Sequence, residues 1–91
     1  MISILRKRDI SNLYISLAQI IAKGLRKFKD IESSGSPVDL SEKEWKVCLN
    51  IMITGFSLYA QDKGMYIPNE LKLMKKAREL FAERFEDLWT Q

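Results

Sequence analysis

The segment from 41 to 62 is apolar around most of its circumference at helical spacing, and this pattern constrains the fold more than any other. A second side of the helix carries Val47, Ile51 and Leu58. Such a helix lies between other helices or offers its second side to another subunit. Because three helices make a thin sandwich, we expect a homo-oligomer with these three residues at its interface. The main face consists of Trp45, Cys48, Leu49, Met52, Phe56, Tyr59 and Ala60.

The start of this helix is marked by Ser41-Glu-Lys-Glu44, which has the form of a capping box. In that motif the serine hydroxyl accepts a hydrogen bond from the glutamate amide, and the glutamate carboxylate accepts one from the serine amide. Leu40 and Trp45 are placed to form the accompanying hydrophobic staple. Lys63-Gly64 is typical of a helix end. The segment is therefore predicted to be helical from 41 to 62.

Two other segments carry apolar residues at helical spacing, one on each side of this helix. Gly24 and Gly55 lie inside predicted helices, where glycine costs about 1 kcal/mol relative to alanine, so we expect them to mark close helix approaches. The first segment spans 9–29, and its apolar stripe is Ile10, Leu13, Leu17, Ile20, Ile21, Gly24 and Phe28, widened by Tyr14 and Leu25. The last spans 69–89, with the stripe Met74, Ala77, Phe81, Phe85 and Leu88, flanked by Leu73, Leu80 and Trp89.

The predicted fold is all-α, with three main helices (9–29, 41–62 and 69–89) in a small antiparallel bundle. The 91 residues are expected to form a single helical domain, 1–91, with residues 1–8 as a flexible basic arm. Four aromatic residues could line a pocket for a nucleobase, but their helical spacing favours the core; they are Trp45, Phe81, Phe85 and Trp89.

Composition removes most catalytic chemistry. The chain has no histidine and one cysteine, so it lacks the usual general base near neutral pH and any Ser-His or Cys-His arrangement. Cys48 alone forms neither an intrachain disulfide nor a zinc cluster, and we interpret it as a small buried apolar residue. The acidic residues Glu79, Glu83, Glu86 and Asp87 favour a solvated or salt-bridged face over a metal site. We expect no enzyme activity, cofactor or metal.

The net charge of +3 conceals separated patches. Residues 1–29 carry seven basic groups against one acidic group, and the last helix has a basic start and an acidic end. That order opposes the helix macrodipole, so a compensating partner is expected: an acidic ligand, the basic first helix, or an antiparallel copy. The candidate ligand or partner-binding residues are Arg6, Lys7, Arg8, Lys72, Lys75, Lys76 and Arg78; a solubilising face is the alternative.

Several short motifs occur in a fixed order, and together they resemble a group of short, uncharacterised proteins of tailed bacteriophages. That group has a "TLA-II" helix, a Gly-x-Pro loop, a "W…MI.AF" helix and a terminal "LF…LW" helix. The matching residues are Leu17-Ala18, Ile20-Ile21, Leu25, Phe28-Lys29, Gly35-Ser-Pro37, Glu44-Trp45, Met52-Ile53, Gly55-Phe56, Glu79-Leu-Phe81, Phe85 and Leu88-Trp89.

The resemblance implies a phage or prophage origin and expression in the host bacterial cytoplasm. Together with the missing catalytic groups, it favours a non-enzymatic binding protein that counteracts host defence. Such a protein would bind a defence protein or sequester a nucleotide signal such as a cyclic nucleotide. The alternative is a nucleic-acid-associated accessory factor in phage replication or transcription. No apolar run approaches the roughly 20 residues of a membrane span, so no membrane association is expected.

Overall fold

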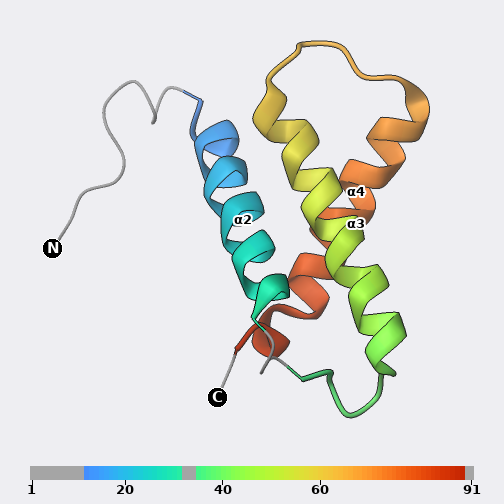
Figure 1. Ribbon diagram of the computed structural model, residues 1–91. Helices are drawn as coiled ribbons and strands as arrows, with labels where there is room; N and C mark the ends of the chain where they lie inside the picture. The colour runs from blue at the N-terminus through green and yellow to red at the C-terminus, as the bar shows by residue number, and fades with distance from the viewer. Residues whose placement is uncertain (1–11, 32–34, 90–91) are drawn as a thin grey trace, which may run out of the picture.

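A computed structural model describes residues 12–31 and 35–89 and consists of three helices and a short 3-10 turn. Helix α2 spans Leu13–Asp30, α3 spans Glu42–Gln61, α4 spans Pro68–Glu83, and the turn η1 spans Phe85–Asp87. The three helices alternate in direction along the chain, as expected for an antiparallel bundle (Figure 1). The predicted all-α fold is thereby confirmed, while the proposed arm at 1–8 lies outside the described residues.

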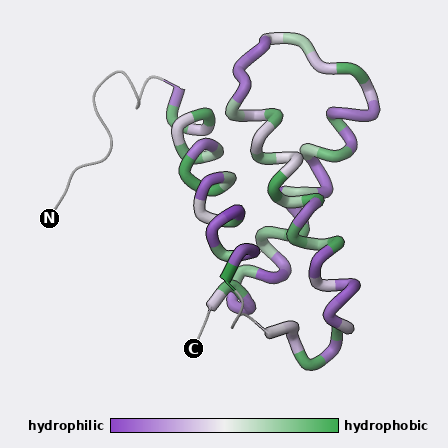
Figure 2. The backbone as a smooth tube through the Cα atoms, in the orientation of Figure 1, coloured by the Kyte–Doolittle hydropathy of each residue, from purple (hydrophilic) through white to green (hydrophobic). Residues whose placement is uncertain are grey.

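Helix α3 is central, because both α2 and α4 pack on it. No Cα atom of α2 lies within 8 Å of one in α4. The described part of the chain is correspondingly flat, with principal extents of 40 × 39 × 19 Å. Apolar residues recur along all three helices (Figure 2), and Met52 in the middle of α3 is fully buried. The core is therefore a single layer organised around α3.

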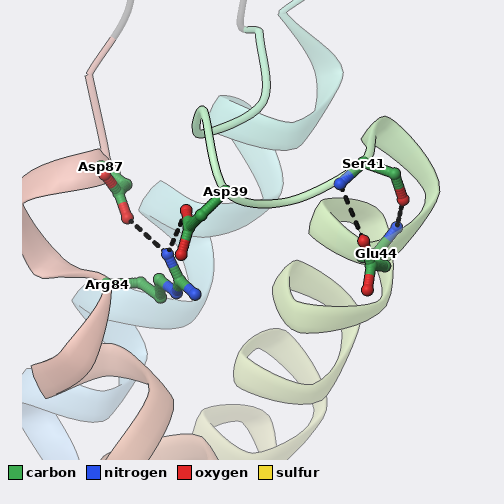
Figure 3. Close-up of polar contacts among 5 residues, drawn as sticks. All are labelled: Asp39, Ser41, Glu44, Arg84 and Asp87. Carbon is green, nitrogen blue, oxygen red and sulfur yellow. Dashed lines mark hydrogen bonds and ion pairs between the residues drawn. The ribbon is translucent and has the colours of Figure 1, made fainter.

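The capping box at the start of α3 forms as predicted (Figure 3). The Ser41 hydroxyl accepts a hydrogen bond from the Glu44 amide at 3.1 Å, and the Glu44 carboxylate accepts one from the Ser41 amide at 2.9 Å. The bond from the Ser41 amide favours the ionised carboxylate and, with a smaller contribution from the Ser41 side chain, lowers the pKa of Glu44. The helix ends at Gln61, where Asp62 adopts a left-handed backbone conformation.

Helix α2 turns a different side toward α3 than the sequence predicted. Its buried residues are Ile15, Ala18, Ala22 and Leu25. The expected core residues Leu13, Tyr14, Leu17, Ile20 and Gly24 are exposed, while Ile21 and Phe28 are half-buried and Ile10 lies outside the described residues. The prediction of this stripe was therefore wrong for most of its members. The physical reason is that two alanines spaced four residues apart let α2 pack closely on α3.

Helix α4 ends six residues earlier than predicted. At Arg84 the backbone leaves the helical conformation, with φ −108° and ψ 14°, and the chain continues into η1. The Arg84 guanidinium donates to Asp39 at 3.0 Å and to Asp87 at 3.4 Å (Figure 3). These contacts raise the pKa of Arg84 and, through the same hydrogen bond, lower that of Asp39. The arginine thus holds the loop before α3 against the end of α4.

The change of direction at Arg84 moves the last aromatic residues away from the predicted core stripe. Phe81 is half-buried and Leu88 packs against the core, but Phe85 and Trp89 are 60% and 61% exposed. The prediction that the last two belong to the core was wrong. The third buried position of α4 is instead Leu80, after Met74 and Ala77.

The reversed charges of the last helix are partly compensated within the chain. Near its start, Glu70 accepts a hydrogen bond from the Ile67 amide at 3.0 Å and forms an ion pair with Lys63 at 2.6 Å. Both partners lower the pKa of Glu70, with Lys63 the larger influence. Near its end stands the cation Arg84, where the macrodipole favours positive charge.

Of the two glycines predicted to mark close helix approaches, only Gly55 does so. A Cβ atom added there would overlap the Cβ of Ala77 and lie 3.0 Å from the Leu73 carbonyl oxygen. A Cβ atom added at Gly24 would meet nothing within 4 Å. The prediction for Gly24 was therefore wrong.

Replacing Gly55 by alanine should lower the free energy of unfolding by about 1–3 kcal/mol, because the added methyl group forces α3 and α4 apart. The matched control is Gly24→Ala, which should raise it by about 0.5–1 kcal/mol because alanine is the better helix former and has room. Urea unfolding followed by circular dichroism measures both. Equal stabilisation by the two substitutions would show that the contact between α3 and α4 is looser than described.

Candidate functional site

A row of apolar side chains on α2 faces away from the core. Leu13, Leu17 and Ile20 are 39%, 41% and 42% exposed, and Gly24 continues the row. Their spacing of four, three and four residues places them on one side of the helix over about 16 Å, at 1.5 Å per residue. We call these four residues the α2 ridge. Single exposed apolar residues are ordinary, and a row of three on one helix makes this side a candidate interaction surface.

A groove runs along one side of the ridge, where α2 and α4 stay apart. Its volume is about 350 Å³, near the lower limit for ligand pockets. Tyr14 and Tyr59 meet edge-on across it, with ring centroids 6.2 Å apart. We call it the α2/α4 groove; it is lined by Tyr14, Leu17, Ala18, Ile21, Phe56, Tyr59 and Arg78. Its walls are therefore mostly apolar, with a single charged side chain.

A second hollow, of about 360 Å³, lies on the other side of the ridge. It exists because Gly24 contributes no side chain there, and we call it the Gly24 hollow. Its lining consists of Gln19, Ile20, Lys23, Gly24 and Lys27. The ridge is thus flanked by a depression on each side, with one basic side chain in the groove and two in the Gly24 hollow.

The cations beside the ridge have no carboxylate partner in the described parts of the chain. Lys23, Lys27 and Arg78 are all exposed, and the ion pairs found in 12–31 and 35–89 involve other residues. By contrast, Arg26 donates to the Ser57 hydroxyl at 2.6 Å, and Lys29 donates to the Asn50 side chain at 2.6 Å. These two cations connect α2 to α3, which leaves the first three available to a partner.

The basic residues proposed from the sequence do not form one site. Lys72, Lys75 and Lys76 are exposed on α4, whereas Arg78 lines the groove beside α2. Helical spacing continues the side of Lys72 and Lys76 into Glu79 and Glu83, so this surface carries both signs of charge. The remaining candidates, Arg6, Lys7 and Arg8, lie outside the described residues.

The three residues expected at a subunit interface also differ in their surroundings. Val47 is exposed, Ile51 is half-buried against the core, and Leu58 is buried within the chain. A surface that includes all three is therefore not available on the folded chain. Apolar side chains are exposed on α2 as well, where Leu13, Leu17 and Ile20 are about two-fifths exposed.

Aromatic side chains extend from the core toward the chain end. Phe28 meets the buried Trp45 edge-on at 6.5 Å between ring centroids, and Phe81 lies between Phe56 at 5.2 Å and Phe85 at 5.4 Å. This arrangement agrees with the core interpretation for Trp45 and Phe81. The thiol of Cys48 is half-buried beside the same core.

Within 12–31 and 35–89, no group of three metal-ligating side chains is close enough to hold an ion. No helix in these ranges is long and apolar enough to cross a membrane. Protein-family models, curated proteins and solved structures include no match to the chain. The resemblance to phage proteins therefore stays a prediction.

The ridge should be dispensable for folding. Ile20→Glu is expected to change the free energy of unfolding by no more than about 0.5 kcal/mol, since the side chain faces away from the core. Met52→Ala is the contrasting variant, and it should cost about 2–5 kcal/mol because its site is fully buried. Chemical denaturation of both variants checks this. A similar loss in the two would mean that Ile20 is covered in the folded protein.

Proposed function

We propose that the protein is a non-enzymatic binding protein that acts by stoichiometric association with another protein through the α2 ridge. The observation that carries this proposal is the exposure of three large aliphatic side chains in one row, on the side of α2 that the core does not use. Such a row, bordered by hollows and cations, has the features of a protein-binding surface. The resemblance to phage proteins supports a host defence protein as the partner and the host bacterial cytoplasm as the place of action.

Two small-molecule or nucleic-acid alternatives have specific supporting features. A nucleotide signal needs cations around a hollow, and Lys23 with Lys27 beside Gly24 provides them. A nucleic-acid accessory factor needs a basic surface, and Lys72, Lys75 and Lys76 on α4 provide part of one. The apolar ridge favours a protein over both, because neither phosphate ligand would use its aliphatic side chains.

Photo-crosslinking in bacterial cells tests the protein-binding proposal. With benzoylphenylalanine in place of Leu17, we expect an adduct whose mass is not a multiple of the 10.6 kDa chain. The same group in place of Lys76, which is exposed on α4, is the control and should give none. Adding Ile20→Glu to the Leu17 variant should remove the adduct, because a buried carboxylate in the interface is unfavourable. Adducts of equal yield from both positions would contradict the proposal.

Titration calorimetry with a panel of cyclic nucleotides, and a gel shift at low salt, separate the alternatives. The protein-binding proposal expects no heat and no shift. Binding heat with a cyclic nucleotide would instead support nucleotide sequestration, provided that Lys23→Gln abolishes this heat and Ile20→Glu leaves it unchanged. A shift abolished by Lys76→Gln would support the nucleic-acid factor, with an affinity that falls steeply as salt rises.

A further inference from the structure

We infer that the occupant of the α2 ridge is an amphipathic helix whose apolar side is bordered by acidic residues. This inference rests on the proposed function and adds the chemistry of the partner. It follows from the shape of the surface, from the sign of the charges beside it, and from the poor match of the other possible occupants.

The shape of the surface fits a helix. The ridge extends for about three turns, or about 16 Å, which is the length over which a partner helix presents side chains at i, i+4, i+7 and i+11. A hollow of about 350 Å³ on one side and one of about 360 Å³ on the other can receive those side chains. At Gly24 the absent side chain lets a second backbone approach closely.

The charges on both sides of the ridge are positive. Lys23 and Lys27 border the Gly24 hollow, and Arg78 lies in the α2/α4 groove. No aspartate or glutamate lines either depression. A partner helix with carboxylates beside its apolar residues would therefore meet cations on both edges, and complementary charge of this kind increases association rate and selectivity.

A second copy of the chain matches this surface poorly. A parallel pair of α2 helices would bring together two C-terminal halves that each carry four basic residues and one acidic residue, and an antiparallel pair would set these cations against the uncharged half 13–22. The segment before α2 is also basic, with Arg6, Lys7 and Arg8 against Asp9. Like charges at an interface suppress association, so neither occupant has the charge that these cations favour.

An anionic membrane also offers negative charge, but it lacks the matching shape. Interfacial helices insert a continuous bulky apolar side between the lipid headgroups. Here the bulky part of that side ends before Gly24, and the groove beside Leu17 is lined by Phe56 and Tyr59 of α3. Depressions of this kind favour protruding side chains of a folded partner over lipid chains.

Two designed helical peptides test the inference on the full chain. Both carry leucines at i, i+4, i+7 and i+11 and a covalent helix staple; one has glutamates beside the leucines, the other lysines. Fluorescence anisotropy should give a Kd for the acidic peptide roughly tenfold lower than for the basic one, because three exposed ion pairs each contribute modestly. The difference should shrink as salt rises. Leu17→Glu should abolish binding of the acidic peptide.

Charge variants test whether the cations beside the α2 ridge cause the preference for the acidic peptide. Lys23→Gln and Arg78→Gln should each reduce the preference for the acidic peptide about two- to threefold. Lys76→Gln, on the outer side of α4, is the matched control and should leave it unchanged. An equal reduction by all three would show that only the net charge of the protein matters, and it would overturn the inference.

The other occupants give distinct results. A dimer in native mass spectrometry that Leu17→Glu dissociates would assign the ridge to a second copy and overturn the inference. Binding to vesicles of anionic phospholipid that Leu17→Glu abolishes, with no binding of either peptide, would assign the ridge to a membrane and overturn the inference. Tighter binding of the peptides after removal of residues 1–8 would show that the chain covers its own ridge. If neither peptide binds while the crosslink at position 17 persists, the acidic helix is refuted and the proposed function stands.

Discussion

The close contact of Gly55 with Ala77 is the constraint on which the arrangement of the other elements depends. Because Gly55 has no side chain, α4 lies against α3 at a distance that any larger residue would prevent. On the other side of α3, Ala18 and Ala22 of α2 occupy positions that are almost fully buried. Small residues thus bring both flanking helices close to α3, and the large aromatic and aliphatic side chains of the core come mainly from α3 itself.

This use of small residues determines what remains on the surface. Since α2 meets α3 through alanines, its leucines and isoleucines need not all point inward. Since α2 and α4 each pack on α3 and remain apart, the space between them is only partly filled, and the α2/α4 groove results. The candidate site is therefore a direct consequence of the packing that gives the fold, and no separate structural element builds it.

Much of the fold could be predicted because its signals are local. The capping box at Ser41 lies within four residues, and the glycine at 55 stands out inside a helix. The side of α2 that packs on α3 could not be found in this way. The apolar residues of α2 cover more than half of its circumference. Leu17 and Ile20 are more hydrophobic than Ala18 and Ala22, so the sequence favours them for the core, but the alanines are the residues that pack on α3. The end of α4 was missed because Arg84 depends on Asp39, 45 residues away.

The proposed surface lies on α2, whereas the sequence favoured the second side of α3 and the lysines of α4. The sequence indicated a surplus of apolar surface, and the structure agrees, but helical spacing alone does not say which helix is turned outward. The sequence also indicated a ligand at the lysines of α4, because positive charge at a helix start opposes the macrodipole. Glu70 and Arg84 compensate part of that opposition within the chain, so the macrodipole gives less reason to expect a ligand at those lysines. For Leu17 and Ile20, no contact within the described chain gives a comparable reason for a large apolar side chain on the outward side of α2. Leu17 and Ile20 are 41% and 42% exposed, and this exposed part is the surface that the proposed partner would cover.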